Sequence, residues 1–134
     1  MSERAMGSFE VKVVQQKPDT QIARAANLGR LTIDKRYHGE LEGTGKGEML
    51  AAQTDTKESG GYVALERVSG TLKGRSGSFV LQHNGTRDRG KAATTVLVVP
   101  DSGTGELRGL SGRMNIIVAA DGAHSYELDY RLEA

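Results

Sequence analysis

A glutamate and a histidine lie on two short apolar segments joined by a glycine-rich turn. The segments span residues 61–69 and 78–84. With Gly74-Arg75 as the central turn residues, counting back along both strands places Glu66 directly opposite His83. A carboxylate and an imidazole that meet on an apolar face change each other's proton affinity. We therefore predict that this pair acts as general acid and base, or holds a polar group of a ligand.

Four aromatic side chains are suited to the wall of a pocket, and two of them, Tyr62 and Phe79, share the predicted face of this pair. The four residues are Tyr37, Tyr62, Phe79 and Tyr126. The tyrosines combine an apolar ring with a polar hydroxyl group, and the phenylalanine ring is purely apolar. The alternative for each is core packing. The alternative for Glu66 and His83 is that they only satisfy each other and fix strand register. A turn of odd length would also place His83 on the other face.

The segments that position these residues alternate apolar and polar side chains, and glycine-rich turns separate them. The alternation predicts about eight strands. Their expected ranges are 7–14, 30–42, 47–54, 61–69, 78–84, 93–99, 106–119 and 124–132, with turns at 43–45 and 100–103 and a possible short helical turn at 22–26. In the last hairpin, a three-residue loop around Gly122 pairs Ile116 with Tyr126 and Met114 with Leu128, which keeps apolar side chains together.

Short antiparallel strands are best satisfied by closing the sheet, because closure removes exposed edges. The predicted fold is therefore all-β: a single domain over 1–134, folded as a closed antiparallel eight-stranded barrel. Such a barrel is filled by side chains or holds one small ligand. The chain has 18 glycines and 4% aromatic residues, so we expect an interior incompletely filled near one end. A packed sandwich remains the alternative.

Charge and composition argue against several functions. The 18 basic and 17 acidic residues give a net charge of +1, whereas nucleic-acid binding normally needs a basic excess, so no nucleic-acid partner is expected. No apolar run approaches the roughly 20 residues of a membrane-spanning helix, and no membrane partner is expected. The chain has no cysteine and shows no signal-like start, which favours the cytoplasm. Its three histidines lack the local spacing of metal ligands, so neither a metal nor another cofactor is expected.

Several segments taken together resemble a known family. They lie at 39–43, 47–50, 61–68, 79–83, 100–107 and 124–126. The set is similar to a bacterial family catalogued as domain of unknown function 3224. This resemblance implies a barrel like that of allene oxide cyclase, within the lipocalin-like or calycin-like group, and it implies no established activity. No segment carries the catalytic residues of the cyclase, so an analogy between folds does not transfer its reaction.

These observations lead to one preferred function and two alternatives. The preferred function is binding of a small, mostly apolar molecule inside the barrel, with Glu66 and His83 as polar anchors and the four aromatic residues as walls. The first alternative is an isomerase or cyclase that uses the same pair on a small hydrophobic substrate. The second is a non-catalytic module that forms homo-oligomers through its strands.

Overall fold

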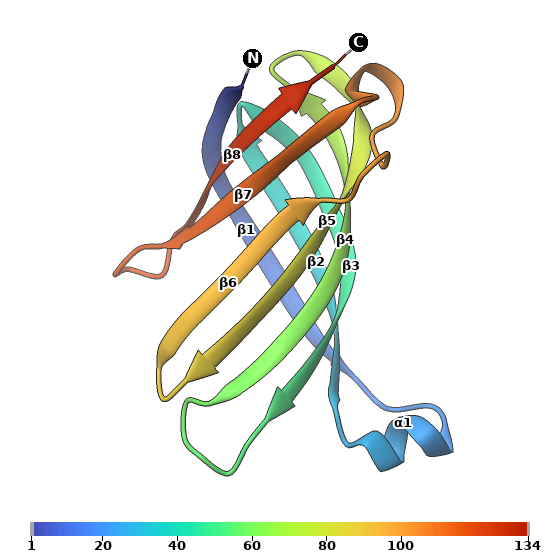
Figure 1. Cartoon of the computed structure of the whole chain (residues 1–134), viewed down its shortest axis with the longest axis vertical. Helices are drawn as coiled ribbons and strands as arrows, with labels where there is room; N and C mark the ends of the chain where they lie inside the picture. Colours follow the sequence, from blue (N-terminus) through green and yellow to red (C-terminus); the bar gives the residue numbers. More distant parts are fainter. Residues whose placement is uncertain (1, 134) are drawn as a thin grey trace.

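The computed structural model of the chain describes residues 2–133 and consists of eight antiparallel strands closed into a barrel in chain order, which confirms the predicted fold class. Figure 1 shows the strands winding around one axis, with the two termini near the same end. The elements are β1 (Glu3–Gln16), α1 (Gln21–Ala26), β2 (Gly29–Gly39), β3 (Leu41–Gln53), β4 (Gly60–Leu72), β5 (Arg75–Asp88), β6 (Lys91–Val98), η1 (Gly105–Leu107), β7 (Leu110–Val118) and β8 (His124–Leu132).

The hairpin between β4 and β5 has a different register from the prediction. Lys73 and Gly74, not Gly74 and Arg75, form the turn, with φ angles of 46° and 84°. Positive φ at both central residues is typical of a type I′ hairpin turn. Glu66 consequently pairs with Leu81, and His83 pairs with Ala64. The predicted register is wrong by two residues, an even number, so the side chains of Glu66 and His83 still point to the same face of the sheet.

The other hairpins confirm some predicted boundaries and correct others. The β7–β8 hairpin has the expected register, with Ile116 opposite Tyr126. Residues 43–45 were predicted as a turn but lie inside β3, and the chain reverses instead at Gly39, whose φ is 106°. Residues 106–119 were predicted as one strand, but a 3₁₀ turn and Gly109, with φ 86°, precede β7. The possible helical turn at 22–26 is α1, which Thr20 caps by accepting a hydrogen bond from the Ala23 N–H.

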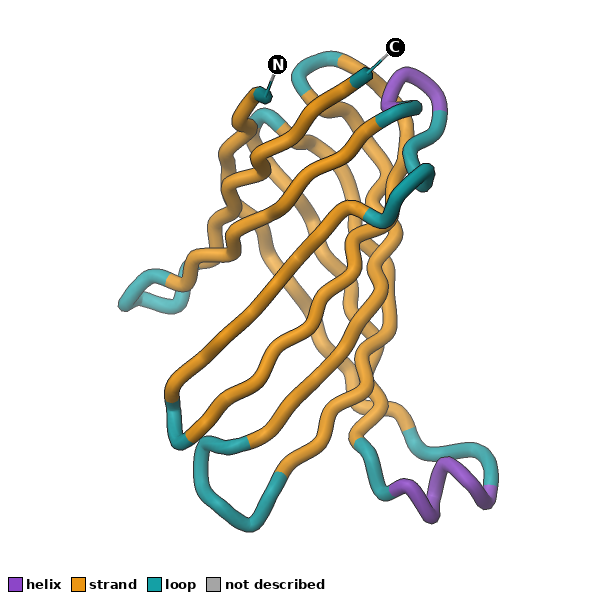
Figure 2. The backbone as a smooth tube through the Cα atoms, in the orientation of Figure 1, coloured by secondary structure: helices purple, strands orange, loops and turns teal. Residues whose placement is uncertain are grey.

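The barrel interior differs between its two ends. At the end near the termini, inward-facing side chains pack into one core that includes Phe9, Tyr37, Leu72, Phe79, Leu81, Leu107, Leu128 and Tyr130. At the other end, β6 and β7 diverge, as Figure 2 shows. Within residues 2–133 these two strands pair at Leu97 and Arg113 alone, whereas β5 and β6 pair from Leu81 to Asp88. We call the packed part the closed end and the diverging part the open end.

A buried charged cluster between the closed and open ends

Glu66 lies at the base of the packed core, and its side chain has no exposure to solvent. Its Oε1 atom lies 3.1 Å from the Nζ of Lys35 and 2.8 Å from the Nε2 of His83. Its Oε2 atom accepts a hydrogen bond of 2.5 Å from the Tyr37 hydroxyl. We call Lys35, Tyr37, Glu66 and His83 the Glu66 cluster. Three donors therefore converge on one buried carboxylate, which is how a buried charge is compensated.

The strand geometry explains how these four side chains meet. Lys35 and Tyr37 are two residues apart on β2, so both point into the barrel. His83 is diagonal to Glu66 across the β4–β5 pair, within reach of a long side chain. Space for the carboxylate comes from Gly45 on β3, because a β-carbon at this position would overlap the Glu66 Oε2 atom. The glycine that looked like a turn residue in the sequence thus accommodates the cluster.

Burial and hydrogen bonding act in opposite directions on the Glu66 carboxyl. Burial alone raises its pKa, but the hydrogen bond from His83, the positive charge of Lys35 and the hydrogen bond from Tyr37 outweigh burial and lower the pKa below its usual range. Burial, together with the Glu66 charge, raises the pKa of Tyr37 well above its ordinary value. At neutral pH the cluster therefore contains an ionised Glu66 and a protonated Tyr37.

Lys35 is the member of the cluster that the sequence analysis missed. Only 6% of it is exposed, and its Nζ atom also lies 4.8 Å from the centre of the Phe9 ring, a favourable cation–π geometry. A signal was present in the sequence. In the alternating pattern of this strand, Lys35 occupies the inward-facing position between Ile33 and Tyr37, on a face that is otherwise apolar. A charged residue at such a position needs a buried partner of opposite charge.

The six predicted site residues lie in three places. Tyr37, Glu66 and His83 come together in the cluster. Phe79 is buried in the core of the closed end. Tyr126 lies there too, and its hydroxyl accepts a 2.9 Å hydrogen bond from the Leu41 N–H and lies 2.9 Å from the His38 carbonyl oxygen, so it closes the β2–β3 turn. Tyr62 lies in the open end, where its ring covers Gly85.

The inner face of the open end presents apolar side chains to solvent. Val13 and Ile116 point inward and are 47% and 36% exposed. A hollow of about 390 Å³ lies at the same end and is lined by Met49, Ala51, Tyr62 and the loop between β3 and β4. His83 does not line this hollow, but it lies on the inner face of β5 two residues from Gly85, which the Tyr62 ring covers. Its Nδ1 atom has no hydrogen-bond partner among residues 2–133 and is not sealed from solvent. The open end thus joins an apolar wall to a polar floor.

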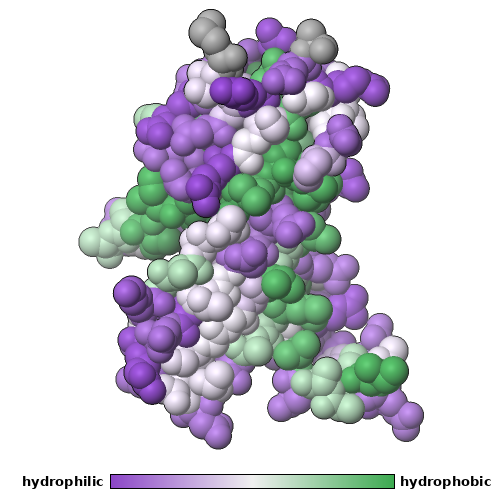
Figure 3. Space-filling view, in the orientation of Figure 1, coloured by the Kyte–Doolittle hydropathy of each residue, from purple (hydrophilic) through white to green (hydrophobic). Residues whose placement is uncertain are grey.

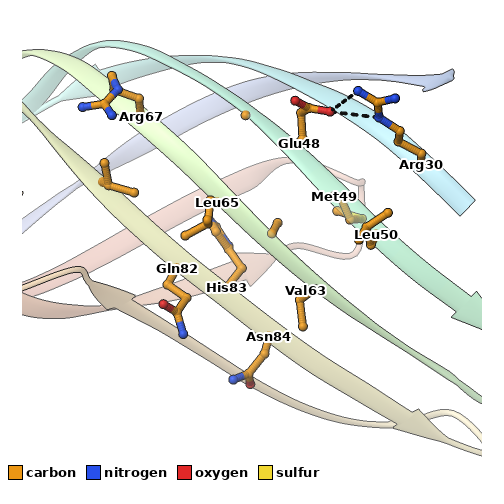
Figure 4. Close-up of a pocket in the computed structure, with 13 residues that line it drawn as sticks. Arg30, Glu48, Met49, Leu50, Val63, Leu65, Arg67, Gln82, His83 and Asn84 are labelled. Carbon is orange, nitrogen blue, oxygen red and sulfur yellow. Dashed lines mark hydrogen bonds and ion pairs between the residues drawn. The ribbon is translucent and has the colours of Figure 1, made fainter. Parts of the chain in front are cut away.

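A larger groove of about 670 Å³ lies on the outer surface of β3, β4 and β5. Figure 4 shows Val63 and Leu65 along this groove, with the Arg30–Glu48 ion pair at one end and Arg67 at the other. Strand alternation places Leu65 and Glu66 on opposite sides of the sheet, so the groove and the cluster have His83 alone in common. Neither Glu66 nor Lys35 lines the groove, and the cluster remains the better candidate site.

Two kinds of feature are absent from the described part of the chain. Residues 2–133 hold no group of three histidine, aspartate or glutamate side chains close enough together to bind a metal ion. Within the same range, no helix has the length and apolar character needed to cross a bilayer.

The stability of the protein should fall in acid because of Glu66. Its pKa is lower in the folded state than in the unfolded state, so Glu66 stabilises the fold above the unfolded pKa, and this contribution disappears as the pH falls through the folded pKa. Urea unfolding between pH 7 and pH 3 measures the effect. In the Glu66→Gln variant, the acid-dependent loss of stability should be smaller than in the wild type. Equal pH dependence in both proteins would contradict the lowered pKa.

Comparisons with known proteins agree with the architecture. A family model described as "Protein of unknown function (DUF3224)" matches residues 5–130. A crystal structure of a DUF3224 protein of unknown function from Shewanella oneidensis MR-1 is 42% identical, has a TM-score of 0.90, and aligns with 100% of this chain and 99% of its own. The curated proteins contain no match. Family match and shared barrel together show that the chain belongs to the DUF3224 family.

Proposed function

We propose that this protein binds a small, mostly apolar molecule in the open end of the barrel, with the Glu66 cluster as the polar floor of the site. The observation that carries the proposal is a fully buried, three-donor carboxylate at the boundary between a packed core and an accessible apolar wall. Ligand sites typically combine an apolar lining with a few placed polar groups.

Stability alone gives little reason for this cluster. Replacing a buried ion pair with well-packed apolar residues is often neutral or stabilising. An apolar lumen with leucine and methionine in place of Glu66 and Lys35 should therefore fold with similar stability. A charged cluster that an apolar pair could replace at little cost in stability is better explained by recognition of a ligand.

The members of the cluster have different roles in this proposal. Glu66 is a positioning residue, since both of its oxygens are occupied and it does not reach solvent. His83 and Lys35 are 5% and 6% exposed and are the groups that meet the ligand. This arrangement favours binding over the isomerase alternative, because a carboxyl with a lowered pKa is a poor proton donor at neutral pH.

Titration with N-phenyl-1-naphthylamine, a neutral apolar fluorescent probe, tests the proposal. We expect saturable binding with a rise in fluorescence. Met49→Lys places a charge on the inner wall and should weaken binding at least tenfold, whereas His83→Leu should weaken it less, because the probe keeps its apolar contacts. Mass spectrometry of molecules that co-purify with the protein would then identify the natural ligand.

Leu65→Lys is the matched control, because Leu65 projects from the outer face of the same sheet and is 56% exposed. This variant should bind the probe as the wild type does. If Leu65→Lys abolished binding while Met49→Lys left it unchanged, the outer groove would be the binding surface. Absence of binding to the wild type would contradict the proposal for this class of ligand.

We also propose that the protein works in the bacterial cytoplasm. The lack of cysteine is compatible with a reducing compartment, and the family relative described above is bacterial. Fractionation of the native host, with detection by an antibody, tests the location. Recovery from the periplasm or the medium would contradict it.

A further inference from the structure

The end of β7 nearest its hairpin has a free edge. β8 covers one side of β7 along its whole length, from Leu110 to Val118. On its other side, β7 pairs with β6 at Arg113 alone within residues 2–133. The stretch 114–118 therefore has no strand beside it in the described part of the chain. Figure 1 shows the β7–β8 hairpin projecting away from the body of the barrel.

The backbone groups at this edge follow from the ladder geometry. Ala119 donates its N–H to the carbonyl of Ala123 across the hairpin, so the alternate residues Ile117 and Asn115 also direct their backbone groups toward β8. The N–H and C=O groups of Ile116 and Val118 consequently point to the free edge. Unpaired groups of this kind are a template for another strand.

The side chains around the edge are exposed and apolar on both faces of the strand. Ile116, Ile117 and Val118 are 36%, 43% and 62% exposed. Figure 3 shows a hydrophobic patch over this hairpin. Three consecutive exposed β-branched residues are unusual on a monomer surface, and natural edge strands normally carry charges or proline for protection. The segment 114–120 contains neither.

We propose that β7 pairs with β7 of a second copy of this chain, antiparallel and with the two-fold axis at Ile117. In this register Ile117 faces its symmetry mate, and Ile116 faces Val118 of the other copy. The four N–H groups of Ile116 and Val118 in the two copies then each meet a carbonyl, which completes the ladder. The result is a continuous sheet that runs β8–β7–β7–β8 across the dimer.

A second copy fits this edge because the edge is self-complementary. An antiparallel strand related by a two-fold axis presents the same residues in reverse order. With the axis at Ile117, every cross-strand pair from Ile116 to Val118 joins two β-branched apolar side chains, a favourable combination in a sheet. No like charges face each other, and no polar side chain is buried opposite an apolar one within these pairs.

Light scattering coupled to size-exclusion chromatography tests the pairing across a range of protein concentrations. We expect a dimer for the wild type and a monomer for Ile117→Lys and for Ile117→Glu, because each variant places two like charges directly opposite. Mixing the two variants should restore the dimer, since opposite charges then meet at the axis. Circular dichroism verifies that each variant keeps its strand content.

A cysteine variant tests the position of the axis independently of stability. The chain has no natural cysteine. Facing residues at a non-hydrogen-bonded antiparallel pair have Cα atoms about 4.5 Å apart, within the range that a disulfide spans. Ile117→Cys should therefore form covalent dimers under air oxidation with copper phenanthroline, with a yield at least tenfold above that of Leu65→Cys.

Leu65 is the control in both experiments, because it is apolar and at least as exposed as Ile117 but lies on β4, which is paired on both of its sides. Leu65→Lys should remain a dimer. A monomeric wild type, a dimer that survives Ile117→Lys, or equal cross-linking of the two cysteine variants would overturn the proposal. None of these results would alter the outcome of the probe titration, so the proposed ligand site stands or falls separately.

Discussion

Replacing Glu66 with leucine is expected to lower the free energy of unfolding by about 3–5 kcal/mol, because the ammonium group of Lys35 would then lie buried without a compensating charge. Lys35 is only 6% exposed and has no other acidic side chain in contact, among residues 2–133, to replace Glu66. His83 and Tyr37 would lose their hydrogen-bond acceptor in the same change. Urea or thermal unfolding, followed by circular dichroism, measures the loss.

The double variant Lys35→Met/Glu66→Leu is the control for this prediction. It removes both charges and fills the space with apolar atoms, so its stability should return to within about 1–2 kcal/mol of the wild type. A large coupling energy in the double-mutant cycle would follow. If the double variant were as unstable as Glu66→Leu, the ion pair itself would be needed for folding, and the argument for a ligand site would lose its main support.

Gly45→Ala should destabilise the protein by about 1–3 kcal/mol, the usual range for overpacking. The added methyl group would overlap the Glu66 Oε2 atom, and the carboxylate cannot move without losing the Tyr37 hydrogen bond. The free energy of unfolding in urea gives the magnitude. Probe binding should weaken as well, because His83 is positioned by the displaced carboxylate.

Gly61→Ala is the matched variant for comparison. Gly61 also lies in a strand, but a β-carbon there would meet its nearest atom at an ordinary 3.5 Å. Its stability should stay within about 0.5 kcal/mol of the wild type, as for most surface substitutions. Similar losses in both variants would mean that the cost at residue 45 comes from the strand backbone, and the Glu66 cluster would not explain the glycine.

The strand alternation explains why the cluster was partly predictable from the sequence. A period of two puts Glu66 and His83 on one face for any even register shift, so the two-residue error in the turn did not separate them. The turn itself was misplaced because several glycines near residue 74 offered similar turn chemistry. The choice of Lys73 and Gly74 depends on positive φ at a lysine, which sequence preference does not favour.

Glycine also has two structural roles in this chain, and the sequence did not distinguish them. At residue 122 it adopts a positive φ in a hairpin, as predicted. At residues 45 and 47 it lies in β3 and makes room for Glu66 and for the close approach of β4. That distinction depends on what lies across the sheet, which is tertiary information. The limited pairing of β6 with β7 could not be predicted from the sequence either. Local patterns predict where strands occur, but they do not predict how many residues of two strands pair.

The junction at Leu97 and Arg113 has a mechanical consequence for the whole barrel. A cylinder hydrogen-bonded around its full circumference resists widening, because every change in diameter shears many ladders at once. Here β6 is paired with β5 from Leu81 to Asp88 but with β7 at Leu97 and Arg113 alone, so among the described strands this seam has the fewest hydrogen bonds to break. Under the proposed function, a larger ligand would be accommodated by widening this seam, and not by stretching the whole ring of strands.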